Sequence, residues 1–226
     1  KSYVAYWGGN RQIETYIRAR DSAPQQLLLF LEYFPHTVEN WLLDHPDQLG
    51  NALAQMQKAV RFLNQRGILH FDCDYGNAVT DGSLVCLTDF GLAIDQAYTL
   101  SPEERYFWEE HRDYDRALLL GATAWHFFVR YQQLTEEQRA EVAERCAMTA
   151  EMNFSEMAVQ LVANLEELSV RGYLNLEKDA VALVVKHRPV ILWMGKFLNE
   201  LRKSSHKDLP FDQATLRKLL QEAPAA

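Results

Sequence analysis

The amino-acid sequence predicts an α+β protein in which a small β-sheet accompanies a larger helical part. Short apolar runs separated by turn residues fill the first 34 positions and recur between residues 67 and 90. Three- and four-residue apolar spacing instead dominates residues 48–66 and almost everything after residue 113. With 226 residues and 48% hydrophobic content, the chain is long enough and apolar enough to bury a full core. We therefore expect one large lobe with a small appendage.

The beginning of the chain is predicted to form a small antiparallel sheet. The expected strands cover residues 2–7, 14–22 and 26–34. Gly8-Gly9-Asn10 and Ser22-Ala23-Pro24 supply the turns between them. Pro35 then ends the last strand, and Thr37 is a candidate N-cap for the helix that TVENWLLDH begins.

A long amphipathic helix is predicted over residues 48–66. Its apolar residues recur at helical spacing, and they are Leu49, Leu53, Met56, Val60 and Leu63. Gly67 is expected to stop it. Two apolar runs at 67–71 and 83–90, with Asp81-Gly82-Ser83 between them, then indicate a hairpin-like pair that holds a loop.

The rest of the chain is helical in its period. The expected helices lie near 113–132, 136–148, 153–169, 177–186, 189–204 and 212–221. We divide the chain into a residual, strand-containing small lobe at 1–34 and a helical large lobe at 35–226.

Composition excludes some functional classes. A net charge of −8 argues against nucleic-acid binding, which depends on clustered Lys and Arg. Three cysteines without a CxxC pair fit neither a disulfide framework nor a zinc site, so a reducing, cytoplasmic location is expected. No apolar run is long enough for a membrane segment, and the first residues lack the apolar core of a signal peptide.

Two short loops carry the candidate chemistry. Asp72 and Asn77 lie in LHFDCDYGN, and Asp89 lies in LTDFGLA. If the intervening strands bring both loops to one edge, the three side chains surround one small volume with oxygen donors. Oxygen ligands without a nearby thiol favour Mg²⁺, which commonly shares its coordination shell with phosphate oxygens. The residues themselves therefore point to phosphoryl transfer.

These loops resemble the catalytic loop and the metal-binding motif of protein kinases. HFDCDYGN is similar to H-R-D-L-x-x-x-N, and DFG follows it in the family's order. The resemblance implies a protein-kinase-like fold that uses ATP and Mg²⁺. It implies that Asp72 orients or deprotonates the attacking hydroxyl, while Asn77 and Asp89 hold Mg²⁺. His70 is implied to support the loop.

The resemblance extends to about residues 25–121. LLLFLEYF is similar to the strand and hinge that bind adenine, which implies base contacts from the backbone of Glu32 and Phe34 and a gatekeeper position at Leu31. Asp115 corresponds to the aspartate that opens the central helix of the large lobe and supports the catalytic loop. Ser101-Pro102-Glu103 is similar to the family's A-P-E, whose glutamate pairs with a later arginine, here Arg171 or Arg188.

Several positions depart from the family pattern. Phe71 replaces an arginine that receives an activation-loop phosphate in many members, so control by that phosphate is not expected. Asp74 stands in place of a lysine that contacts the transferred phosphate. No glycine-rich phosphate loop and no convincing strand lysine precede Glu32. The small lobe is thus expected to be reduced, or part of it is missing from this chain.

Three functions remain open on this evidence. The leading one is a Ser/Thr protein kinase-like enzyme. Gly76-Asn77 and the short segment between Gly91 and Ser101 also resemble aminoglycoside phosphotransferases, whose acceptors are small molecules. The missing glycine-rich loop and lysine favour a third function, a pseudokinase that binds or scaffolds without transferring phosphate.

Overall fold

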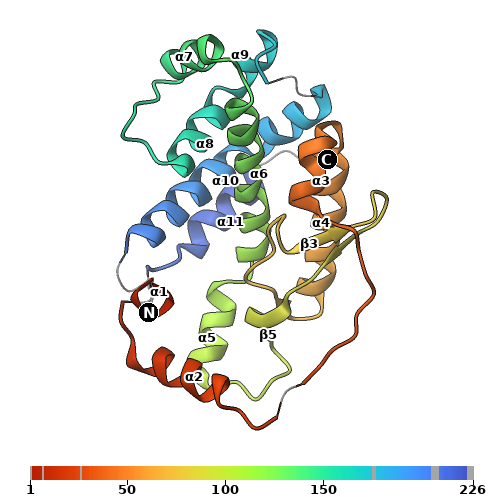
Figure 1. Ribbon diagram of the computed structural model, residues 1–226, viewed down its shortest axis with the longest axis vertical. Helices are drawn as coiled ribbons and strands as arrows, with labels where there is room; N and C mark the ends of the chain where they lie inside the picture. The colour runs from red at the N-terminus through yellow and green to blue at the C-terminus, as the bar shows by residue number, and fades with distance from the viewer. Residues whose placement is uncertain (1, 7, 26, 175–176, 205–208, 223–226) are drawn as a thin grey trace. The chain divides into compact units, whose positions relative to one another are not determined.

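The computed structural model describes residues 2–6, 8–25, 27–174, 177–204 and 209–222, and it has the predicted α+β class (Figure 1). The chain divides into two compact units. The larger unit contains the residues from Phe34 to Phe197 and those from Phe211 onward. The smaller unit contains the residues before Phe34 and those from Leu198 to Pro210.

The smaller unit begins with helices where strands were predicted. α1 covers Ser2–Tyr6 and α2 covers Arg11–Asp21, so the strand predictions at 2–7 and 14–22 are wrong, with residue 7 outside the described residues. The Asn10 side chain caps α2 by accepting from the Gln12 N–H at 2.9 Å. Glu14 and Arg18 pair one turn apart at 2.7 Å. These local interactions favour a helix over an isolated strand.

The third predicted strand, at 26–34, is also absent from the part of the chain that the structure describes, and residue 26 lies outside it. Residues 27–34 have no regular secondary structure. A strand needs a neighbour to pair its N–H and C=O groups. Because residues 2–6 and 11–21 form the helices α1 and α2, they offer no such neighbour.

The larger unit contains short strands and most of the helices. Its strands are β1 (His36–Thr37), β2 (Ile68–Leu69), β3 (Ala78–Thr80), β4 (Val85–Leu87) and β5 (Ile94–Asp95). Its first helices are α3 (Val38–Asp44), η1 (Pro46–Gln48), α4 (Leu49–Gln65), η2 (Phe90–Leu92) and α5 (Pro102–Glu110). Those that follow are α6 (Tyr114–Gln132), α7 (Glu136–Arg145), α8 (Phe154–Ala163), α9 (Leu165–Val170), α10 (Lys178–Lys203, which extends beyond the unit) and α11 (Gln213–Glu222).

The strands form two small antiparallel sheets. β1, β3 and β4 make a three-stranded sheet in that order, and β2 pairs with β5. The hairpin at Asp81-Gly82-Ser83 therefore joins β3 to β4, and the predicted pairing of 67–71 with 83–90 is wrong. A tight turn pairs the residues directly beside it, which are Ala78–Thr80 and Val85–Leu87.

The helices of the larger unit follow the predicted periodicity with three differences. Thr37 caps α3 by accepting from the Asn40 N–H, and α4 ends before Gly67, whose φ is 77°, as predicted. The expected helix at 153–169 is interrupted at Asn164, between α8 and α9. α5 was not predicted.

The two helices predicted at 177–186 and 189–204 are one helix, α10, with Pro189 inside it. Proline removes one backbone hydrogen bond from a helix interior. Pro189 is exposed, so water can reach the region of the missing bond, while Val184 before it and Val190 after it are buried. Burial on both sides of Pro189 keeps the helix continuous.

α6 lies at the centre of the larger unit and packs against α4 and α8 (Figure 1). Leu119, Leu120 and Phe127 of α6 have no exposed surface. This central position matters for function because the first turn of α6 carries Asp115, as predicted. Among the described helices, none combines the length and the apolar character needed to cross a membrane.

Candidate active site

The loop between β2 and β3 is fixed by a buried carboxylate. Asp115 is fully buried in the first turn of α6. Its two carboxylate oxygens accept the backbone N–H of His70 at 2.7 Å and of Phe71 at 2.8 Å. The amide of Asn64, from α4, also donates to it at 3.3 Å. Three donors therefore compensate the buried charge and set the start of the loop.

His70 connects this loop to the DFG segment. It is fully buried, and its Nε2 lies 2.9 Å from the carbonyl oxygen of Thr88. Its Nδ1 accepts the Asp72 N–H at 3.3 Å, which requires that Nε2 carries the proton and donates to Thr88. The Phe90 ring meets the imidazole edge on, with ring centres 4.7 Å apart. His70 thus has the supporting position that the sequence suggested.

Asp72 is half-buried and follows this anchored backbone. Partial burial raises the pKa of its carboxyl, and the negative charge of Asp74 raises it further. A hydrogen bond from Asn77 and the nearby His70 act in the opposite direction, and Asp89 adds a smaller upward effect. Asn77 also donates its amide N–H to the Asp72 carbonyl oxygen at 2.9 Å. The structure therefore brings Asp72, Asn77 and Asp89 together.

Asp89 has a backbone conformation that is uncommon for a residue with a side chain. Its φ of 56° and ψ of 66° place it in the left-handed region, directly before η2. One carboxylate oxygen, Oδ1, accepts the Gly91 N–H at 3.3 Å. Asp89 is exposed, so its other carboxylate oxygen can reach a ligand.

Asp74 has a structural function that the sequence reasoning missed. Its Oδ1 accepts the backbone N–H of Gly76 at 2.9 Å and of Asn77 at 3.0 Å. This side-chain turn orients Asn77 toward Asp72. The signal was present in the sequence, since an Asp two residues before a Gly is typical of such turns.

Phe71 takes part in an aromatic cluster rather than in any charged contact. Its φ of 63° is strained for a bulky residue. Its ring packs against Phe107 of α5 and Tyr114 of α6, with centres 5.5 and 5.4 Å apart. His111 stacks on Phe107 at 4.0 Å, and burial lowers the pKa of its imidazole. The cluster thus holds the Phe71 ring between α5 and the start of α6.

The predicted adenine-binding residues lie along the chain at the boundary between the two units. Leu31 is 78% exposed, and Glu32 is exposed beside it, both in the smaller unit. Phe34 is partly exposed in the larger unit, two residues before β1. No strand forms around them in the described chain, so the adenine-binding role stays a prediction.

The predicted ion pair of Glu103 is wrong. Arg171 pairs with Glu167 at 3.0 Å and Arg188 pairs with Glu166 at 2.8 Å. Glu103 is exposed in the first turn of α5, where Ser101 and Glu104 form a capping box. The acidic residue thus belongs to a helix start and does not connect α5 to a later helix.

The described residues contain no group of three or more His, Cys, Asp or Glu side chains placed to hold a metal ion. Mg²⁺ needs fewer protein ligands when phosphate oxygens complete its coordination shell, since one or two carboxylates can then suffice. Asn77 donates through its amide nitrogen, which leaves its oxygen available, and Asp89 has one carboxylate oxygen without a hydrogen bond. The donor set is therefore compatible with Mg²⁺ held jointly with phosphate.

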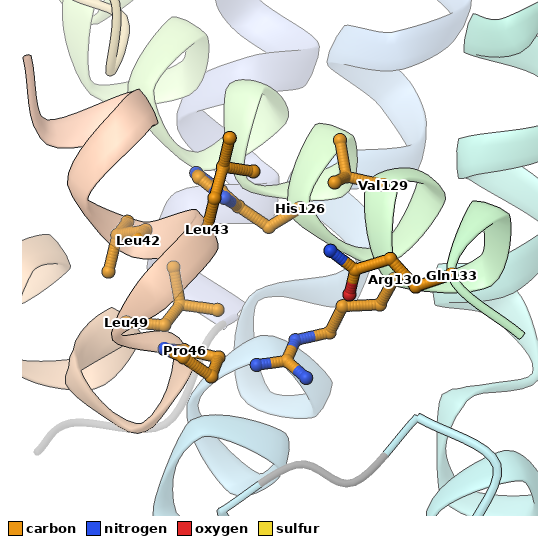
Figure 2. Close-up of a pocket in the computed structure, with 8 residues that line it drawn as sticks. All are labelled: Leu42, Leu43, Pro46, Leu49, His126, Val129, Arg130 and Gln133. Carbon is orange, nitrogen blue, oxygen red and sulfur yellow. The ribbon is translucent and has the colours of Figure 1, made fainter.

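A hollow of the larger unit lies between α3, η1, the start of α4 and the end of α6 (Figure 2). Leucines and a proline form one wall, and the other consists of His126, Val129 and Arg130 of α6 with Gln133 directly after that helix. The Arg130 guanidinium donates to the Leu174 carbonyl oxygen at 3.2 Å. None of the predicted site residues lines this hollow, which is therefore separate from the candidate active site.

In comparisons with family models, with curated proteins and with solved structures, no match to this chain was found. The arrangement of Asp72, Asn77 and Asp89 therefore has to be interpreted from its own chemistry.

Proposed function

We propose that the protein is an ATP- and Mg²⁺-dependent phosphotransferase with a kinase-like fold, and that its acceptor is a serine or threonine hydroxyl of a protein. One observation carries the proposal. Asp72, a carboxyl with a raised pKa, lies beside Asn77 and Asp89 on a loop that the buried Asp115 anchors.

Asp72 would act as the base. A hydroxyl that attacks the terminal phosphate must lose its proton, and a positioned carboxylate accepts that proton as the new O–P bond forms. The raised pKa of Asp72 makes its carboxylate a stronger base than that of an ordinary aspartate. Its backbone is held by the Asn77 amide, so the carboxylate is oriented before substrate binds.

Asn77 and Asp89 would hold Mg²⁺ through the oxygen atoms that their hydrogen bonds leave available. When bound, this ion neutralises negative charge on the phosphates that flank the transferred group. The carboxylates of Asp72, Asp74 and Asp89 raise the local negative potential, and a cation would relieve their repulsion. ADP leaves as the phosphoryl group passes to the acceptor oxygen.

A second candidate function, nucleotide binding without transfer, is favoured by the smaller unit. Residues 2–33 contain no lysine. The helices α1 and α2 lie in the part of the sequence where a kinase would have a phosphate-binding strand and loop. The Gly8 and Gly9 N–H groups donate to the carbonyls of Ala5 and Val4, so these glycines end α1. A small-molecule hydroxyl remains an alternative acceptor, since β5 and the short loop after it offer little surface to an extended peptide.

Mg²⁺-ATP binding and turnover by the purified chain test the proposal. Calorimetry measures binding, and labelled ATP with protein and small-molecule acceptors measures transfer. We expect Mg²⁺-dependent binding that Asp89→Ala weakens at least tenfold, together with transfer that this variant abolishes. Binding without transfer to any acceptor would support the non-transferring function, and Mg²⁺-independent binding or none would refute the proposal.

A further inference from the structure

Residues 27–33 form an unusually exposed apolar segment, which we name the apolar arm. Leu27, Leu28, Leu29 and Leu31 are 71–85% exposed, and Phe30 is 96% exposed. Within the part of the chain that the structure describes, the backbone of the arm forms no hydrogen bond with another segment. A continuous apolar patch of this kind marks an interaction site in a soluble protein.

The same unit also contains an apolar hollow on α1 and α2. The hollow has a volume of about 550 Å³, and its lining residues are Tyr3, Ile13, Tyr16, Ile17 and Arg20. Ile13, Ile17 and Arg20 lie on one face of α2, at four- and three-residue steps. No residue of α2 is buried, so the arm of the same chain does not cover this face.

The charges of the two surfaces are complementary. Glu32 is the only charged residue between Ser22 and Pro35, and it lies within the arm. Arg20 lies at the hollow and forms no ion pair with another described residue, whereas the neighbouring Arg18 is paired with Glu14. The apolar arm with its single carboxylate, Glu32, therefore matches the apolar hollow with its unpaired cation, Arg20.

We propose that two copies of the chain form a twofold dimer in which the apolar arm of each copy lies in the α1–α2 hollow of the other. Glu32 of each copy then pairs with Arg20 of its neighbour. The arm and the hollow are on one chain, so two copies can satisfy both surfaces at once and close the assembly at two. The inference is independent of the proposed phosphotransfer.

Sedimentation velocity of the full chain over a range of micromolar concentrations tests the dimer. We expect a reversible monomer–dimer equilibrium for the natural sequence. Phe30→Ser should abolish the dimer without lowering the thermal stability of the monomer, because the Phe30 side chain is almost fully exposed in one copy. A natural chain that stays monomeric at all these concentrations would overturn the proposal.

Charge reversal identifies the contact. Arg20→Glu and Glu32→Arg should each weaken dimerisation on the order of tenfold or more at low salt, because each creates two like-charge contacts per dimer. A mixture of the two variants should recover the dimer as a heterodimer, and so should the double variant. Recovery also excludes misfolding as the cause of the loss.

Arg11→Glu is the matched control, since Arg11 is an exposed arginine of α2 that does not line the hollow. It should leave the equilibrium unchanged. Equal weakening by Arg11→Glu, or failure of the mixture to recover dimers, would contradict the assigned contact. Assemblies larger than dimers would also contradict the assigned contact, because they would indicate that the arms of different copies pair with one another.

Discussion

At the scale of single residues, the carboxyl of Asp72 is the group on which the proposed chemistry depends most. Asp72→Asn keeps the size of the side chain and removes its ability to accept a proton. We expect transfer to fall by about 10²–10⁴-fold, while Mg²⁺-ATP binding stays within a few-fold of the natural chain. Single-turnover transfer and calorimetry on the same samples measure the two effects. Unchanged transfer in this variant would remove Asp72 from the mechanism.

Asp74 provides a separate prediction on pH dependence. Transfer requires ionised Asp72, so the rate should fall toward acid pH through the raised pKa of that carboxyl. Asp74→Asn removes a neighbouring negative charge and keeps the Oδ1 that accepts from Gly76 and Asn77. The acid limb of kcat/KM should therefore move to lower pH.

The control for this shift is Asp44→Asn, which changes an exposed carboxyl at the end of α3. It should leave the profile in place. If the Asp74 variant also leaves the acid limb in place, the limb belongs to a group other than Asp72.

Single residues also show what local sequence patterns can and cannot predict. Asp72, Asn77 and Asp89 could be grouped in advance because their motif spacing is local and the strands between them are short. The resemblance places Asp74 at the position of a family lysine, which hides its role as a turn residue. The packing of Phe71 on Phe107 joins positions 36 residues apart, as their numbers show, and no local pattern indicates it.

At the scale of elements, the contact between α6 and the loop after β2 is the main support of the candidate site. Asp115→Ala would leave the N–H groups of His70 and Phe71 without their buried acceptor. We expect a loss of about 3–5 kcal/mol in the free energy of unfolding, measured by urea denaturation. Asp44→Ala, at an exposed site, should change it by less than about 0.5 kcal/mol. A loss of similar size in both variants would contradict the assigned role.

A buried histidine of α6 gives a prediction about stability and pH. Burial, with a smaller effect from Arg130, lowers the pKa of His126 from 6.5 to about 4. Below pH 6.5 the unfolded chain therefore binds a proton that the folded chain does not. The stabilisation that neutral His126 gives to the folded chain is complete above pH 6.5. As the pH falls from 6.5 to 4, this group lowers the free energy of unfolding progressively, by roughly 3 kcal/mol.

His126→Phe should flatten this part of the stability profile in urea denaturation at several pH values. His36→Gln changes an exposed histidine of β1 and serves as the control. An unchanged slope in the His126 variant would assign the acid sensitivity to other groups.

Elements were predicted well where one periodic pattern dominates. α4 follows from its apolar repeat and from Gly67, and α3 follows from Thr37. α2 was mistaken for a strand although Ile13 and Ile17 are four residues apart, which is a helical interval. α5 was missed although Ser101 and Glu104 form a capping box that is visible in the sequence. The pairing of β2 with β5 depends on tertiary contacts and could not be predicted locally.

At the scale of the whole molecule, stability is concentrated in the larger unit. Among the described residues, every buried apolar side chain belongs to Val38 or a later position. Brief chymotrypsin treatment of dilute protein should therefore cut first within residues 27–34. The product that begins there should retain the melting temperature of the intact chain within a few degrees.

Mass spectrometry locates the first cut, and circular dichroism follows the melting of the product. Protection of the same bonds at higher protein concentration would agree with the proposed dimer. First cleavage within α4 or α6 would instead show that the larger unit opens before the arm is reached.

The carbonyl oxygen of Gly67 joins several parts of the chain beside the candidate site. It accepts the Gln96 N–H at 3.0 Å and the Trp108 Nε1–H at 3.1 Å. Gly67 directly precedes β2, the strand that pairs with β5. The stretch from Gln96 to Trp108 is consequently anchored at both of its ends in the folded chain. Most of the conformational entropy of this stretch is thus lost when the chain folds and not when an acceptor binds. Acceptor binding should accordingly show a small entropic penalty, with a heat capacity change that reflects the contact surface alone.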